Sequence, residues 1–228
     1  MPEKVIATNE TIRDLVRDAI EKYGPNSNLN FIEVSQVTDM KELFTDTQFN
    51  GDISKWDVSN VVDMWGMFLA SGFNGDISLW NVSKVTNMGW LFNSSPFTGN
   101  ISGWDVSNVT DMSYMFAHSV FNGDISGWMV SNVRDMNCMF HDSQFNGDIS
   151  KWKVGKVTNM YAMFDSSQFN GDISKWRVGR ATELSQMFKN SPFNGDISNW
   201  KVRKTAKMFF MFEGTPLERE RRLPRWYR

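Results

Sequence analysis

A 24-residue unit recurs through most of the chain and constrains its fold more than any other feature. The hexapeptide Phe-Asn-Gly-Asp-Ile-Ser returns at a constant interval of 24 residues, and only at 97–102 does it read Phe-Thr-Gly-Asn-Ile-Ser. A fixed period without insertions is typical of a solenoid, in which each unit packs against its neighbours. We number the positions of the unit 1 to 24, and position 1 is occupied by Phe49, Phe73, Phe97, Phe121, Phe145, Phe169 and Phe193.

The apolar positions of the unit hardly change from one repeat to the next. Position 8 is Trp, position 10 is Val and position 20 is Phe in all seven units. Residues 25–48 carry apolar residues at the same positions and form a degenerate unit before the seven regular ones. A single unit cannot bury these side chains, whereas stacked units bury them as continuous ladders. Because a buried indole N–H needs an acceptor, we expect one tryptophan hydrogen bond repeated in every unit.

The spacing within the unit predicts its local structure. Residues 53–58 read Ile-x-x-Trp-x-Val, the spacing of a leucine-rich-repeat strand, and residues 61–68 place Val, Met, Met and Phe at helical spacing. Asn-Gly at 50–51 favours a tight turn that leads to the next strand. The sequence therefore predicts a leucine-rich-repeat-like solenoid with short parallel strands on one face and short helical turns on the other.

Both ends of the chain depart from the repeat. Residues 1–24 contain an amphipathic segment that begins near Asn9, and we expect a capping helix there that covers the open edge of the stack. The array of one degenerate and seven regular units spans 25–216. Residues 217–228 form a predicted C-terminal cap. Its apolar side chains, which we expect to fold over the last ladder, are Leu223, Trp226 and Tyr227.

Charge and cysteine content limit the classes of function. The formal net charge is −2, but residues 1–171 carry 11 Lys and Arg against 20 Asp and Glu, whereas residues 172–228 carry 13 against 6. The single cysteine, Cys138, allows no intrachain disulfide, and nothing requires an oxidising compartment. The N-terminal residues lack the apolar run of a signal peptide, and no segment reaches membrane-spanning length. We therefore expect a cytoplasmic monomer that does not associate with membranes.

Three variable positions are the candidate ligand-binding sites. Positions 17 and 18 are expected to face outward because the flanking methionines face inward, and position 9 lies between the inward Trp and Val. Aromatic and apolar residues recur there, as they do at binding hot spots. The alternatives are neutral surface variation and aromatic rings that pack sideways along the stack. The candidates are Trp65, Trp90, Tyr114, Tyr161, Phe209 and Phe210, with Met129 at position 9.

Basic residues form a second candidate surface in the last three units. Position 9 is occupied there by Lys153, Arg177 and Lys201, and further Lys and Arg residues lie nearby in the unit. In a stack these residues form rows that suit an acidic protein or a phosphate backbone. A plain solvated face is the alternative. No stacking motif of defined spacing accompanies the charge, so we rank nucleic acid below a protein ligand.

The aspartates at position 4 invite a metal-binding interpretation. Stacked carboxylates are conceivable calcium ligands. Asn100 occupies the same position in one unit, however, and an amide oxygen can replace a carboxylate as an acceptor for backbone N–H groups in a turn. We therefore interpret these aspartates as turn residues and expect neither a metal nor a cofactor.

A catalytic interpretation has one candidate cluster. Cys138 and His141 are three residues apart, and His118 and Asp142, like His141 and Asp165, are one repeat apart and stack in a solenoid. Nucleophilic catalysis needs such proximity. Only one unit carries the cysteine, and neither an oxyanion hole nor a cleft is indicated. We therefore expect no enzyme activity.

The units, written FNxDISxWDVSxVTDMxxMF, resemble the BspA-like bacterial surface repeat family, which is related to leucine-rich repeats. The resemblance covers residues 25–216 and implies a solenoid used for adhesion or protein recognition, without catalysis. The sequence as a whole predicts a non-catalytic scaffold for a protein ligand. Electrostatic binding of nucleic acid and a purely structural or assembly role are the alternatives.

Overall fold

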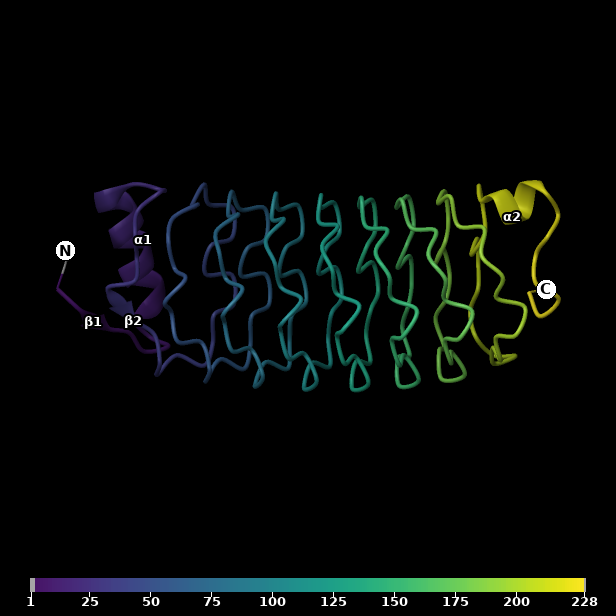
Figure 1. Ribbon diagram of the computed structural model, residues 1–228, viewed down its shortest axis with the longest axis horizontal. Coiled ribbons are helices and arrows are strands. Elements are labelled where there is room, and N and C mark those ends of the chain that lie inside the picture. Colours follow the sequence, from purple (N-terminus) through teal and green to yellow (C-terminus); the bar gives the residue numbers. More distant parts are fainter. Residues whose placement is uncertain (1–2, 228) are drawn as a thin grey trace.

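The computed structural model describes residues 3–227 and shows a repeat solenoid. Within that range the named elements are β1 (Val5–Ile6), α1 (Ile12–Tyr23), β2 (Ile32–Glu33) and α2 (Pro216–Arg219). Between the two helices the chain winds as a row of similar turns, with α1 at one end of the row and α2 at the other (Figure 1). The predicted stack of repeats is therefore present.

The predicted arrangement of strands on one face is wrong. Residues 53–58 form no strand. Units pair in parallel on the opposite side instead, through single-residue bridges at position 15 that run from Asp39–Asp63 to Glu183–Lys207. Among the described residues, no backbone bridge joins positions 5–10 of neighbouring units, and the ring centroids of Trp152 and Trp176 lie 6.4 Å apart.

The predicted helical turns are also wrong, because positions 16–22 form a chain of tight turns. Met67 donates its N–H to the Met64 carbonyl, three residues back, whereas Met64 donates to Asn87 of the next unit at 3.0 Å. Positions 18, 20 and 22 likewise donate to the next unit. An α-helix needs each N–H to reach the carbonyl four residues back. Here alternate N–H groups point along the stack, so no helix forms.

These turns place positions 18 and 22 of each unit in the left-handed backbone region. At position 18, φ is +61° for Trp90, +56° for Tyr114 and +49° for Ala162. Side-chain-bearing residues lose roughly 1–2 kcal/mol in left-handed helical geometry. Gly66, with φ +60°, occupies the same position without that strain. The fold therefore accepts glycine at position 18.

We expect Ala162→Gly to raise the melting temperature by about 1–3 °C, because the roughly 1–2 kcal/mol of left-handed strain that it relieves exceeds the roughly 0.4–1 kcal/mol that glycine costs through freedom of the unfolded chain. The matched control is Ala117→Gly. Both alanines are buried, but Ala117 lies at position 21, outside the left-handed residues. There glycine only adds freedom to the unfolded chain and should lower stability by about 0.4–1 kcal/mol. Thermal denaturation compares the two, and an equal loss in both variants would contradict the left-handed assignment.

The core consists of aromatic ladders that run the length of the array. Phe68 and Phe92 stack with centroids 5.6 Å apart and planes 2° apart. Trp104 donates its indole N–H to the Ile77 carbonyl of the preceding unit at 3.2 Å, and the same bond recurs in all seven regular units. The predicted shared solution for the buried indoles is therefore confirmed.

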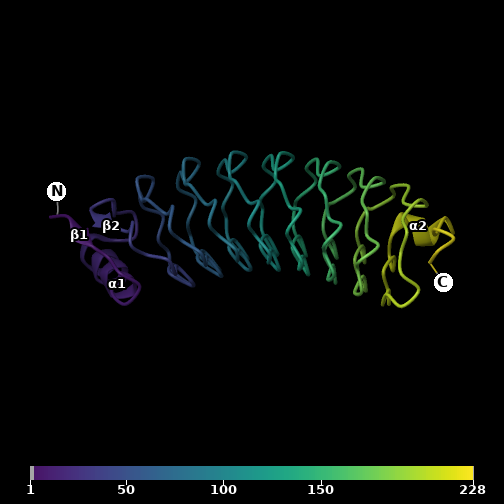
Figure 2. The same cartoon turned by 90° about the horizontal axis from the view of Figure 1, so that it is seen from below.

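Neighbouring units lie closer together on one side of the array than on the other, and this difference makes the array curve. Equivalent phenylalanines of position 20 lie 5.4–5.8 Å apart, and the tryptophans of position 8 lie 6.4–6.5 Å apart. On the side where the position-15 bridges join the units, the distance between neighbouring backbones is held near the roughly 4.8 Å of paired strands. The array therefore bows, as Figure 2 shows. Because the closer spacing and the bridges lie at positions 15–22, we assign these positions to the concave inner face and positions 6–12 to the convex outer face.

The N-terminal segment provides partners for the open edge of the first unit. Ile12, Val16 and Ala19 of α1 are buried against the core. Asn9 accepts the N–H groups of residues 38 and 39 on its Oδ1, at 2.9 and 3.2 Å. In later units these N–H groups use a carbonyl of the preceding repeat. The segment thus replaces a missing unit, in the way that terminal caps act.

The C-terminal segment extends the core by one more layer. Trp226 stacks on Trp200 with centroids 6.1 Å apart and donates its indole N–H to the Ile197 carbonyl at 3.0 Å. Tyr227 packs edge-on against Phe212 at 4.9 Å. Leu223 is half-buried against the same core. The expected folding of these residues over the last ladder is confirmed.

The glycine of position 3 is needed for packing and not for the predicted turn. No turn is formed at residues 50–51, and the nearest turn lies at residues 54–55. A Cβ built on Gly75 would lie 2.8 Å from the ring of Phe73, closer than side chains tolerate. Any larger residue would therefore push the buried phenylalanine of position 1 out of its ladder.

Candidate ligand-binding faces

The aromatic row, which we define as Trp65, Trp90, Tyr114, Tyr161, Phe209 and Phe210, lies on the inner face. Trp65 and Trp90 pack at 6.3 Å with planes 49° apart, and Trp90 stacks on Tyr114 at 4.1 Å. Each of these three is half-buried. Sideways packing along the stack, one of the alternatives for these residues, therefore describes the first part of the row, although each side chain stays partly exposed.

The end of the aromatic row is more open. Phe209 and Phe210 are 66% and 58% exposed, whereas Tyr161 is half-buried. The amine of Lys189 lies 5.6 Å from the centroid of the Phe210 ring, within the range of a cation–π contact. Phe209 and Phe210, together with Tyr227, line a cavity of about 570 Å³. An apolar side chain of a partner would find both a ring surface and a hollow here.

The cysteine of the inner face is a buried free thiol. Cys138 is 4% exposed, and burial raises the pKa of its thiol because the thiolate loses solvation. The pKa of Tyr114 is raised to about 12, first by its hydrogen bond with Cys138 and then by burial. A reactive cysteine needs a lowered pKa. The geometry therefore supports a structural interpretation of this thiol.

The two histidines pack on each other beside that thiol. Their rings meet edge-on at 5.0 Å. His118 Nδ1 lies 3.1 Å from Asp142, a hydrogen bond, whereas His141 Nδ1 lies 3.8 Å from Asp165, which is beyond hydrogen-bond distance. The structure thus brings together the stacked pairs that the 24-residue spacing predicts, with one close contact and one loose one.

The outer face carries the position-9 residues. Met129 is 60% exposed, and Lys153, Arg177 and Lys201 are all exposed. Within residues 3–227 none of these three basic side chains has an acidic partner within 4.0 Å. Their charge is therefore available to a ligand.

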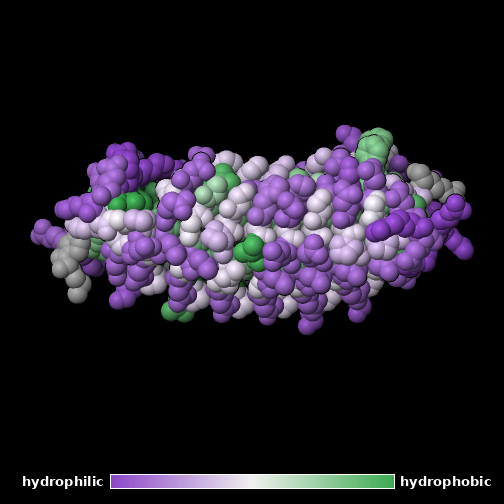
Figure 3. Space-filling model, turned by 90° about the horizontal axis from the view of Figure 1, so that it is seen from above, coloured by the Kyte–Doolittle hydropathy of each residue, from purple (hydrophilic) through white to green (hydrophobic). Residues whose placement is uncertain are grey.

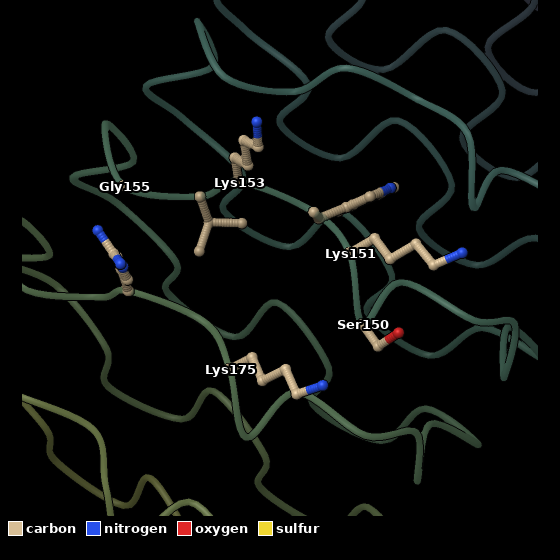
Figure 4. Close-up of a pocket in the computed structure, with 8 residues that line it drawn as sticks. Ser150, Lys151, Lys153, Gly155 and Lys175 are labelled. Carbon is tan, nitrogen blue, oxygen red and sulfur yellow. The ribbon is translucent and has the colours of Figure 1, made fainter.

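Furrows open between the units on the outer face. One furrow of about 700 Å³ is lined by Lys151, Lys153, Lys175 and Arg177. The next furrow, of about 570 Å³, is lined one unit later by Lys175, Arg177, Asn199 and Lys201. Figure 4 shows Lys151 and Lys153 on one turn of the chain and Lys175 on its neighbour. The ring centroids of Trp152 and Trp176 beside these furrows lie 6.4 Å apart. Neighbouring units therefore do not close the space between them here, as they do on the side of the position-15 bridges.

The aspartates of position 4 act as turn residues. Asp148 accepts the N–H of Ser150 on Oδ1 at 2.9 Å, and this bond lowers the pKa of the Asp148 carboxyl. Asn100 accepts the N–H of Ser102 at 3.0 Å in the same way. The predicted hydrogen-bonding role is confirmed. The serine hydroxyl of position 6 adds a second bond, since Ser54 and Ser102 donate their Oγ–H groups to the same acceptor oxygens at 2.7 and 2.8 Å.

Sequence reasoning missed the most exposed apolar residue of the repeats. Leu79 at position 7 of the outer face is 90% exposed, whereas the other units carry Lys, Gly or Asn there. Comparison of the units at position 7 would have found it. Figure 3 shows apolar residues as isolated spots on a largely hydrophilic surface. Single exposed residues of this kind are ordinary on soluble surfaces.

Comparisons with known proteins place the chain in a family. No helix within residues 3–227 has both the length and the apolar character to span a membrane. No curated protein and no solved structure gave a significant match. A family model matches three overlapping stretches, residues 13–124, 73–166 and 117–226, as expected for a tandem repeat. Because these matches cover nearly all of the array, the chain belongs to the family described as Mycoplasma protein of unknown function, DUF285.

Proposed function

We propose that the chain is a non-catalytic scaffold that binds a protein ligand, chiefly through the aromatic row of its inner face. One observation carries this proposal. The large rings share positions 17 and 18 of one face, where other units carry Gly, Ser, Asn, Cys, Ala or Gln, so the fold does not need bulk there. Phe209 and Phe210 remain 66% and 58% exposed. Exposed aromatic side chains that the core does not require are typical of binding hot spots.

The position-9 residues supply a second contact surface for the same class of partner. Met129, Lys153, Arg177 and Lys201 lie on the outer face, where an acidic segment of a protein would meet unpaired positive charge. The resemblance of the repeats to BspA-like and leucine-rich-repeat proteins supports this proposal, since such solenoids serve adhesion and protein recognition. Rigid ladders also favour binding, because the contact residues are ordered before the partner arrives.

The test uses a face-stripped variant in which every ring is replaced by a residue that another unit carries at the same position. Its six changes are Trp65→Ser, Trp90→Gly, Tyr114→Gly, Tyr161→Asn, Phe209→Ser and Phe210→Gly. Proteins retained from a native lysate by the unmodified chain should be retained at least about tenfold less by this variant, since hot-spot losses reach 2 kcal/mol or more.

A matched control distinguishes binding by the inner face from nonspecific hydrophobic binding. Leu79→Gly removes the most exposed large apolar residue of the outer face and uses the glycine found at position 7 of other units. It should retain the same proteins as the unmodified chain. Equal retention by the face-stripped variant, or equal loss in the control, would refute the aromatic row as the recognition site.

Electrostatic binding of nucleic acid is the second candidate, because the basic furrows of the outer face are open and unpaired. If they hold phosphate, the chain should bind generic duplex DNA at low ionic strength and lose affinity steeply with salt. Replacing Lys153, Arg177 and Lys201 with Glu should abolish that binding and leave the fold intact. A chain that binds no DNA at about 20 mM salt would eliminate this candidate.

A further inference from the structure

The charges of position 9 have an order that no fold requirement explains. The acidic end of the row lies near α1, the basic end lies near α2, and an exposed methionine stands in the fourth of the seven units. In chain order the row reads Asp57, Asn81, Asp105, Met129, Lys153, Arg177 and Lys201. All seven side chains are exposed.

This order makes the row complementary to itself when it is reversed. If two copies meet outer face to outer face and antiparallel, Asp57 lies opposite the partner's Lys201, and Asp105 lies opposite the partner's Lys153. Asn81 faces the partner's Arg177, and Met129 meets its own equivalent at the two-fold axis. A two-fold interface requires such reciprocity, in which each residue contacts its counterpart twice.

We propose that a second copy of this chain binds along the position-9 row, antiparallel, with Met129 at the two-fold axis. The inference deepens the proposed function at this second contact surface, because it assigns a second copy of the chain as the protein partner there. It does not depend on the ligand of the aromatic row. It differs from the monomer that the sequence led us to expect. The polarisation of the whole chain, acidic before residue 172 and basic after it, favours the same antiparallel orientation.

Regular spacing keeps the two rows in register. Equivalent tryptophans beside position 9 lie 6.4 Å apart from Trp128 to Trp152 and 6.5 Å apart from Trp176 to Trp200. Two copies share this spacing, so alignment at the centre brings the neighbouring pairs into alignment as well. A ligand with another repeat length would lose register within a few units, whereas a second copy cannot.

The centre of the outer face is open to close approach. Gly103 and Gly127 occupy position 7 beside Asp105 and Met129, and a Cβ on either glycine would meet nothing within 4 Å. The exposed methionine of each copy can therefore contact its counterpart without a flanking side chain in the way. Away from the centre the convex faces diverge, and there the long side chains Arg177 and Lys201 stand opposite short Asn and Asp residues.

Like charges limit the width of the contact. In the antiparallel arrangement the aspartates of position 4 would face one another, and Lys84 would face the partner's Arg180. Both pairings disfavour a broad interface, so the contact is confined to the central row. A narrow interface built on charge forms a weak dimer that salt dissociates.

Charge exchange between copies tests the pairing. The all-basic chain carries Asp57→Lys and Asp105→Lys, and the all-acidic chain carries Lys153→Glu, Arg177→Glu and Lys201→Glu. The fold tolerates either sign, since position 9 already holds both. Sedimentation at low salt should show the unmodified chain as a dimer, each variant alone as a monomer, and their equimolar mixture as a heterodimer. Melting curves of both variants verify that they remain folded.

Cross-linking tests the two-fold axis itself. Met129→Cys should form a disulfide-linked dimer on mild oxidation, because the two Cβ atoms meet at the axis. Asp105→Cys alone should not, but mixed with Lys153→Cys it should. The native Cys138 is buried and does not compete.

The proposal is overturned by a monomeric unmodified chain at low salt, or by failure of the mixed variants to associate. It is also overturned if the all-basic chain binds DNA more tightly, the all-acidic chain loses DNA binding and their mixture forms no dimer, since the row would then be a phosphate site. None of these results affects the capture test of the aromatic row, so the two proposals fail separately.

Discussion

Trp104→Ala should lower the free energy of unfolding by about 3–5 kcal/mol, the range for a truncated core aromatic. The side chain is 3% exposed and lies 6.3 Å from the ring of Phe92. Its loss leaves a cavity in mid-array and leaves the Ile77 carbonyl without the indole hydrogen bond. Urea titration followed by circular dichroism measures the change.

Two companion variants separate the sources of that loss. Trp104→Phe keeps an aromatic ring in the ladder but removes the hydrogen bond, so it should lose roughly 1–3 kcal/mol. Trp226→Ala makes the same truncation in the half-buried C-terminal layer and should lose less than Trp104→Ala. If Trp104→Ala cost no more than Trp226→Ala, position 8 would not be the centre of the core.

Removal of residues 97–120 should leave a folded chain of lower stability, whereas removal of residues 97–108 should unfold it. The longer deletion removes one whole unit and rejoins position 24 to position 1, so each ladder closes over the gap. The shorter deletion joins position 24 directly to position 13. As a result, the position-15 side of one unit lies against the position-8 side of the next. This mismatch breaks the ladders on both sides of the junction.

Near-ultraviolet circular dichroism reports the packed tryptophans and distinguishes the two deletions. The 24-residue deletion should keep the signal with a slightly lower melting temperature, and the 12-residue deletion should abolish it. The reverse result would mean that the units do not stack in register.

The sequence predicted which side chains are buried better than it predicted the backbone. Positions 1, 5, 8 and 10 lie in the core as expected, because a strict period gives every unit the same environment. The backbone between Val61 and Phe68 was misread, since apolar residues at i, i+3 and i+6 suit successive turns with i to i+3 bonds as well as they suit a helix. Side-chain spacing reports which face is buried and does not fix φ and ψ.

The candidate site could be predicted in part because the strict period allows the units to be compared position by position. Comparison of the units found Trp65, Trp90 and Phe209, because bulk at these positions varies while the core does not. Their exposure could not be predicted, since Trp90 packs on the rings of two neighbouring units. The left-handed geometry of Trp90 was equally hidden, because large residues rarely adopt it. Contacts between units, rather than the sequence of one unit, determine both properties.

The most direct test of the account is a paired measurement on the face-stripped variant and Trp104→Ala, in which unfolding and affinity for a captured partner are determined on the same samples. We predict that the face-stripped variant melts no more than about 4 °C below the unmodified chain, since relief of left-handed strain offsets part of the lost ring packing, but that it binds at least about tenfold more weakly. Trp104→Ala should melt far lower, yet bind normally at temperatures where it is folded. If the face-stripped variant melts as low as Trp104→Ala, the aromatic row is part of the core and the account is wrong.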